Sequence, residues 1–135
     1  MFSRIWVDTV ENLVGLIENL ASSVFRSAVA DAEQRINGRG NVFQRLDDTA
    51  DLFSDAGYTG LRATLEPLIW QRLQETWAAR HVFTHNDGVI DDRYLARVPG
   101  SPLHRGQRLV LSEQFCRQAI TDTDALRAAI AGLVT

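Results

Sequence analysis

Apolar residues recur at helical spacing through most of the chain, and this periodicity restricts the fold more than any other feature. The first apolar stripe runs from Ile5 to about Ile36. Apolar positions three and four residues apart lie on one face of an α-helix, so the stripe predicts a long amphipathic helical region. Ser22–Ser23 is a candidate break within it. The glycine-rich segment Asn37–Asn41 is the first clear end, because glycine readily adopts the left-handed conformation of a C-cap.

Three further helical patterns follow. They cover Val42 to Ala56, Leu61 to about Phe83, and a last region that starts near Ser112 and ends near Leu133. Pro67 has no backbone N–H and is tolerated only in the first turn of a helix, so a helix is expected to restart or kink near Glu66. The last region is predicted with or without an interruption at Thr121–Thr123.

The segment between the third and last patterns, from Asn86 to Leu111, is expected to be irregular. Asp91 or Asp92 can cap a short helix there, Pro99–Pro102 is a loop, and Arg108–Leu111 is a short extended segment. The chain has no internal repeat and no linker between two cores. We therefore predict that residues 1–135 form a single all-α domain, a bundle of four main helices with an irregular loop and short extended segment before the last helix.

Composition narrows the class of protein. The net charge is −3, so the molecule as a whole is no polycation, and all fourteen basic side chains are Arg. A single cysteine, Cys116, permits no internal disulfide and fits a reducing compartment. The N-terminal residues lack a basic region followed by an apolar run, and no apolar stretch approaches the roughly 20 residues of a membrane helix. A cytoplasmic domain without a membrane partner is expected.

The residues best suited to chemistry lie where the third helical pattern ends, in the stretch from Arg80 to Gly88. Arg80 and His85 are separated by four residues. A guanidinium can bind a phosphate through two hydrogen bonds, and an imidazole gains and loses a proton near neutral pH. Together they suffice for RNA cleavage without a metal. The imidazole takes a proton from the 2′-hydroxyl, and the guanidinium stabilises the charge that develops on phosphorus oxygens.

The stretch resembles the active-site motif of the HEPN superfamily, which consists of small helical domains common in prokaryotic toxin–antitoxin, abortive-infection and other antiviral defence systems. The motif is an Arg, then Asn, Asp or His, then three to five residues and a His; Arg80, His81 and His85 fit it. The segment RHVFTHNDGVIDDRYL, a Pro-Gly loop and RLVLSEQF are also similar to one prokaryotic branch. The specific resemblance covers about residues 72 to 118.

The resemblance implies a metal-independent endoribonuclease that cleaves single-stranded RNA at a composite site between two protomers of a homodimer. Arg80 and His85 would be catalytic, with His81, Asn86 and Asp87 in support. Neither a metal nor another cofactor is expected, and an antitoxin or other defence-system protein is a possible partner. Asp87 stands where members silenced by a partner nucleotidyltransferase have Tyr, so that form of control is not expected. The alternative is a non-catalytic HEPN-like module that binds RNA, a nucleotide or a partner protein.

Other interpretations of the same residues stay open. His81 and His85, with Asp87, Asp91 and Asp92 nearby, could contribute to a zinc site if a third ligand is fixed close in space. Asn86 and Asp87 are also ordinary turn formers before a glycine. Trp77, on the helix that precedes the motif, is expected in the core or in a dimer interface. The window from residue 72 to 117 carries seven Arg against five acidic residues, which fits a local phosphate-binding region on an acidic body.

Overall fold

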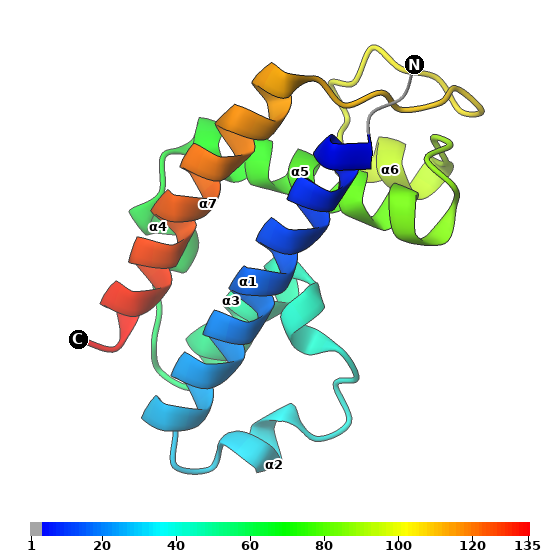
Figure 1. Cartoon of the computed structure of the whole chain (residues 1–135). Coiled ribbons are helices and arrows are strands. Elements are labelled where there is room, and N and C mark those ends of the chain that lie inside the picture. The colour runs from blue at the N-terminus through cyan, green and yellow to red at the C-terminus, as the bar shows by residue number, and fades with distance from the viewer. Residues whose placement is uncertain (1–3) are drawn as a thin grey trace.

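A computed structural model describes residues 4–135 and has an all-α fold (Figure 1). The elements are α1 (Arg4–Ala28), α2 (Ala32–Ile36), the 3₁₀ turn η1 (Val42–Gln44), α3 (Leu46–Asp55), α4 (Leu61–Thr64), α5 (Pro67–His85), α6 (Asp92–Arg97) and α7 (Glu113–Leu133). The described part of the chain contains no strand, so the predicted all-α class is confirmed. Its helices are more numerous than the four main ones expected. The first three residues of the expected domain lie outside the described residues.

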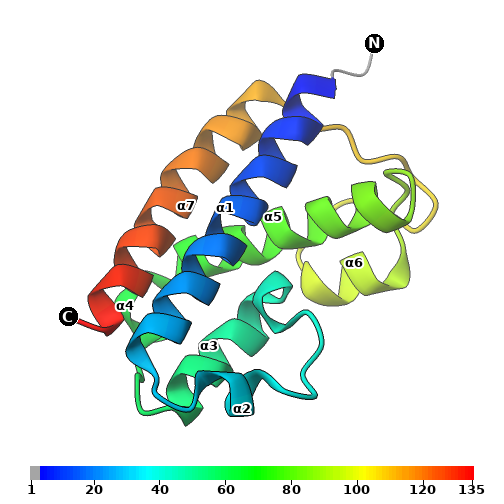
Figure 2. The ribbon, with the colours of Figure 1, turned by 60° about the horizontal axis from the view of Figure 1, so that its bottom comes forward.

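The long helices form the frame of the fold. α1 and α7 lie side by side and run in the same direction, and α5 crosses behind both (Figures 1 and 2). α2 and η1 contact α1, α3 packs against η1 and α4, and α6 packs beside α5, close to its C-terminus (Figure 2). Within residues 4–135, no helix combines the length and apolar character needed to cross a membrane.

Two apolar clusters hold these helices together. The larger one joins α1, α3, α5 and α7 around Phe25 and Phe53, whose rings meet edge to face with centroids 5.2 Å apart. The smaller one contains Val82 of α5, Tyr94 of α6 and Cys116 of α7, all nearly inaccessible to solvent. Burying a side chain of this size contributes about 1.5–3 kcal/mol. The smaller cluster therefore fixes the end of α5 relative to α6.

The first helical stripe breaks at a place that the sequence does not indicate. α1 continues through Ser22–Ser23, where we expected a possible break, and ends at Ala28 instead. The chain turns there so that Val29 and Ala32 are both buried in the larger cluster. The Tyr58 hydroxyl donates a hydrogen bond to the free carbonyl of Ala28 at 3.4 Å. Tertiary packing, rather than a local breaker residue, ends the helix.

Local helix signals are confirmed elsewhere. Pro67 occupies the first turn of α5. The Asp91 carboxylate accepts a hydrogen bond from the backbone N–H of Tyr94 at 2.9 Å, which caps α6. The Ser112 hydroxyl accepts one from Phe115 at 3.0 Å and caps α7, which then runs without interruption through Thr121–Thr123.

The segment from Asn86 to Leu111 is irregular apart from α6, as expected. Backbone hydrogen bonds join its two ends: Ile90 N–H donates to Gln107 at 2.8 Å, and Leu109 N–H donates to Gly88 at 2.8 Å. The expected extended segment at Arg108–Leu111 forms a single antiparallel bridge, between Arg108 and Val89. These bonds close a loop against the end of α5 and hold the turn that follows it.

Candidate active site

The C-terminal half of α5 supplies the candidate catalytic residues. Trp77, His81 and His85 follow one another at intervals of four residues, and Arg80 lies three residues after Trp77, so the four share one face of the helix. The opposite face includes Ala79 and Val82, which are buried in the smaller cluster. Burial of one face therefore directs the other, with its guanidinium and two imidazoles, toward a surface pocket.

A tight turn ends α5 directly after His85. The backbone N–H groups of Asn86 and Gly88 both donate to the Val82 carbonyl, at 2.9 and 3.1 Å. Asp87 and Gly88 have positive φ angles of 53° and 77°. A Cβ atom at position 88 would approach Phe83 to 2.8 Å, so the turn requires glycine there. The turn sets where the helix stops and hence where His85 lies.

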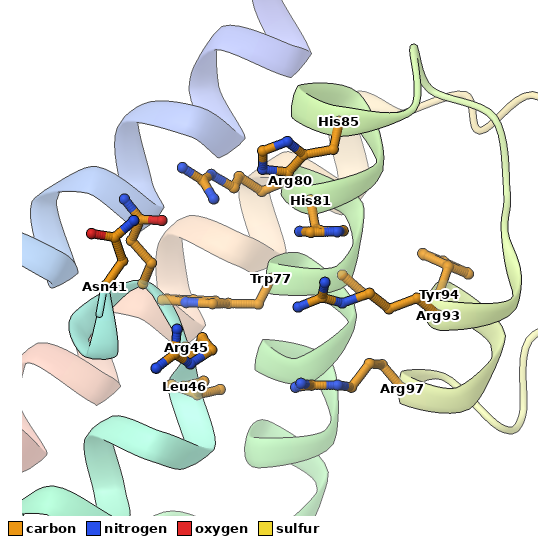
Figure 3. A pocket seen from close by; sticks show the side chains of 12 residues that line it. Asn41, Arg45, Leu46, Trp77, Arg80, His81, His85, Arg93, Tyr94 and Arg97 are labelled. Atoms are coloured by element: carbon orange, nitrogen blue, oxygen red, sulfur yellow. The ribbon is translucent and has the colours of Figure 1, made fainter. Parts of the chain in front are cut away.

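The pocket lies between α5, α6 and the η1–α3 segment and has a volume of about 140 Å³ (Figure 3). Its lining includes Asn41, Gln44, Arg45, Leu46, Trp77, Ala78, Arg80, His81, His85, Arg93, Tyr94 and Arg97. Pockets for whole drug-sized ligands measure about 300–1,000 Å³. This one suits small groups, such as phosphates, that belong to a longer ligand.

The pocket is strongly cationic. Four arginines and two histidines line it, and no carboxylate does. Within residues 4–135, twelve of the fourteen arginines form ion pairs with Asp or Glu; the other two, Arg80 and Arg93, both line this pocket. Neither donates a hydrogen bond to another residue of the part described. Two guanidinium groups with free donors facing one pocket make a site for an anion.

The two imidazoles lie against each other. The ring centroids of His81 and His85 are 4.6 Å apart, and the ring planes are tilted by 47°. Burial lowers the pKa of His81, and the positive charge of Arg93 and the neighbouring His85 lower it further. His81 is therefore neutral at pH 7 and able to accept a proton or a hydrogen bond. His85 is exposed and also lines the pocket.

The structure brings together three of the five residues singled out by the motif. Arg80, His81 and His85 share the pocket, whereas Asn86 and Asp87 do not line it. The Asn86 amide donates to the Val89 carbonyl at 2.7 Å. The Asp87 carboxylate is 97% exposed and lies 3.9 Å from a guanidinium nitrogen of Arg108. These contacts fit the interpretation of both residues as turn formers.

Sequence reasoning missed other parts of the site. Arg93 and Arg97 reach the pocket from α6, and Arg45 reaches it from the start of α3. The sequence held one signal for Arg93 and Arg97: the two residues lie four apart, which is about one turn of the short helix that Asp91 was expected to cap. Trp77 is 7% exposed, as expected for a core residue, but it also lines the pocket.

No third metal-ligating side chain joins the two histidines. Among residues 4–135, no group of three or more His, Cys, Asp or Glu side chains is arranged to hold a metal ion. Comparison with protein-family models, with curated proteins and with solved structures found no match to this chain. The resemblance to the HEPN superfamily therefore stays a prediction from the motif and its surrounding residues.

Proposed function

We propose that the protein is a HEPN-like, metal-independent endoribonuclease that cleaves single-stranded RNA as a toxin or antiviral-defence effector. The observation that carries the proposal is the shared pocket of Arg80, His81 and His85. It combines a guanidinium that has no ion-pair partner in the part described with two imidazoles in contact. A phosphate needs the first for binding, and proton transfer needs an imidazole. The RNA substrate implies action in the cytoplasm.

The reaction is an internal transesterification followed by release of the downstream RNA. His85 acts as general acid/base at the 2′-hydroxyl or the 5′-oxygen leaving group. The 2′-oxygen attacks the adjacent phosphorus, and the bond from phosphorus to the 5′-oxygen breaks. Arg80 stabilises the negative charge on the non-bridging oxygens. The products carry a 2′,3′-cyclic phosphate and a 5′-hydroxyl, so no water, metal or cofactor is consumed.

One imidazole does not readily serve as base and acid in a single step. In the proposed homodimer, two copies of the motif meet at a two-fold axis, and the two His85 side chains divide the roles. The exposure of His85, which also lines the pocket, supports this arrangement, because a partner's side chain or an RNA strand has access to it. His81, neutral at pH 7, supports the orientation of the 2′-hydroxyl or of His85.

The test is cleavage of end-labelled single-stranded RNA in EDTA, followed on a denaturing gel. Wild type, His85→Ala and His104→Ala run side by side, because His104 is exposed in a loop outside the pocket and controls for the loss of an imidazole. We expect a loss of at least a hundredfold for His85→Ala and none for His104→Ala. Cleavage that EDTA abolishes, or that survives in His85→Ala, would contradict the proposal.

The second candidate is a non-catalytic module that binds RNA, a nucleotide or a partner protein such as an antitoxin. It is favoured by the position of Arg80 and Arg93, which form no ion pair within residues 4–135, because anion binding requires these arginines and not the imidazoles. Binding that persists in His85→Ala, with no cleavage by either form at concentrations where the dimer persists, would select this candidate.

A further inference from the structure

The pocket extends beyond the residues that the cleavage motif accounts for. In Figure 3, Arg80 and His85 lie at one end, Arg45 and Arg97 lie at the other, and His81 and Arg93 lie between them. One phosphate bound by Arg80 leaves the α6 arginines unused. A single-stranded RNA carries a further phosphate on either side of the one that is cleaved.

We propose that the pocket holds two consecutive phosphates of one strand: Arg80 binds the scissile phosphate, and Arg93 and Arg97 bind its neighbour. The identity of the ligand as RNA rests on the proposed function. The second site is made by residues outside the motif, and it belongs to the same cavity. Arg93 and Arg97 are thus substrate-positioning residues.

The position of α6 supports a preformed site. Its N-terminus is capped by Asp91, and Tyr94, 3% exposed, anchors the helix in the smaller cluster beside α5. Arg93 and Arg97 lie one helical turn apart and both face the pocket. The backbone that carries the two guanidinium groups is therefore held in place before a ligand binds, which reduces the entropy lost on binding.

The guanidinium groups of Arg93 and Arg97 have hydrogen-bond donors available for a second anion, in addition to those of Arg80. Arg93 has neither an ion pair nor a hydrogen bond within residues 4–135. Arg97 is only loosely paired, because its guanidinium lies 3.9 Å from the Asp47 carboxylate. That carboxylate already accepts shorter hydrogen bonds, from Arg62 at 3.2 Å and Gln74 at 2.8 Å. Arg97 can therefore turn its donors to a phosphate without leaving Asp47 unpaired.

Trp77 provides an internal probe of the pocket, because its side chain is among the lining residues. The same indole gives a fluorescence signal that reports on occupation of the site.

Binding of non-cleavable ligands tests the second phosphate site without requiring cleavage. A 2′-O-methylated dinucleotide has one internal phosphate; the same dinucleotide with an added 5′- or 3′-phosphate has two. Affinities are measured by tryptophan fluorescence and by competition for wild type, Arg80→Gln, Arg93→Gln and Arg127→Gln. Arg127 is an exposed arginine of α7 outside the pocket, so its substitution controls for the lost charge.

We expect the added phosphate to tighten binding to wild type and Arg127→Gln by about tenfold, and this gain to vanish in Arg93→Gln. Arg80→Gln should weaken both ligands by a similar factor and keep the gain. For a longer 2′-O-methylated strand, Arg93→Gln should reduce the slope of log affinity against log salt by about 0.7. The ligand that shows the gain also gives the polarity of the strand.

The outcomes separate this proposal from the proposed function. A gain that is equal in wild type and Arg93→Gln overturns the second site, even if wild type cleaves RNA. A gain that depends on Arg93 supports the second site, even if wild type does not cleave. No binding of any of these ligands to wild type overturns it as well. Circular dichroism checks that Arg93→Gln is folded, which is expected because the side chain is exposed.

Discussion

The imidazole rings of His81 and His85 lie 4.6 Å apart on consecutive turns of α5, at a tilt of 47°. His81 is partly buried and faces Arg93, whereas His85 is exposed. Two protonated imidazoles in this position, with Arg80 and Arg93 nearby, would repel each other. The site therefore favours a neutral His81, and this preference has a consequence for stability as well as for chemistry.

Acidification should destabilise the protein through His81. Burial and the charge of Arg93 lower the pKa of His81 below 6.5, the value expected in the unfolded chain. Between these two pKa values the unfolded state binds more protons, so the stabilisation is complete above about pH 6.5 and is lost as pH falls toward the folded pKa. We expect His81→Gln to lose less stability than wild type between about pH 7.5 and pH 5.5.

Urea unfolding at the two pH values measures this difference, with His104→Gln as the matched control. His104 is exposed in a loop, so its replacement should leave the pH dependence of wild type unchanged. Equal losses of stability in wild type and His81→Gln would show that His81 is not held neutral by the fold.

The turn after His85 should not tolerate a side chain at position 88. Gly88→Ala combines a positive φ of 77° with a Cβ atom 2.8 Å from the Phe83 ring. We expect a loss of about 1–3 kcal/mol in the free energy of unfolding. Since the turn fixes the end of α5, RNA cleavage should also fall. Gly100→Ala is the control, because a Cβ atom there meets no atom within 4 Å.

Thermal or urea unfolding of the two alanine variants, with the cleavage assay in parallel, checks this expectation. A Gly88→Ala variant as stable and as active as Gly100→Ala would mean that the turn can rearrange without moving His85.

How far the sequence predicts this structure depends on whether a feature is local. Pro67 and Asp91 act through their own backbone geometry or a nearby N–H, and the helix starts that they predict are confirmed. The break after Ala28 was missed because burial of Val29 and Ala32 among distant residues causes it, with no Gly or Pro to mark it. Helix existence was therefore predictable, whereas this boundary was not.

The same distinction applies to the site. Arg80, His81 and His85 could be selected together because they lie on one helix at a spacing that chemistry explains. Arg93 reaches the pocket only because Tyr94 packs α6 against α5, and Arg45 because α3 packs nearby. Contacts of this kind follow from tertiary packing and have no fixed spacing in the sequence. The motif thus predicted part of the cationic pocket but not its extent.

An ion pair between a buried carboxylate and a partly exposed arginine should help to fix the position of α5 against α7. Asp122 of α7 is 2% exposed, and Arg72 of α5 donates to both carboxylate oxygens, at 2.8 and 2.9 Å. We expect Arg72→Met to destabilise the protein by about 1–3 kcal/mol, because within residues 4–135 it leaves the buried carboxylate with only the Gln118 amide as a hydrogen-bond partner. Adding Asp122→Leu should recover most of this loss.

Urea unfolding of the single and double variants measures the coupling. The exposed pair of Arg127 and Asp124, 2.9 Å apart, is the control. Arg127→Met should cost less than about 1 kcal/mol. If the double variant were no more stable than Arg72→Met, the loss would come from packing of the Arg72 stem rather than from the unpaired charge.

The composite site of the proposed dimer predicts how activity responds to mixing. If each active site needs His85 from both protomers, a dimer of one wild-type and one His85→Ala chain is inactive. An equal mixture of the two proteins, equilibrated by subunit exchange at fixed total concentration, would then keep about one quarter of the wild-type activity. Sites confined to one chain would keep about half. The close contact of His81 and His85 within one chain makes the second outcome a real alternative.

Cleavage rates across a series of mixing ratios decide between a quadratic and a linear dependence on the wild-type fraction. His104→Ala in place of His85→Ala should leave the rate unchanged at every ratio. A linear dependence, with dimerisation and subunit exchange shown independently, would overturn the composite site and assign the second proton transfer to His81.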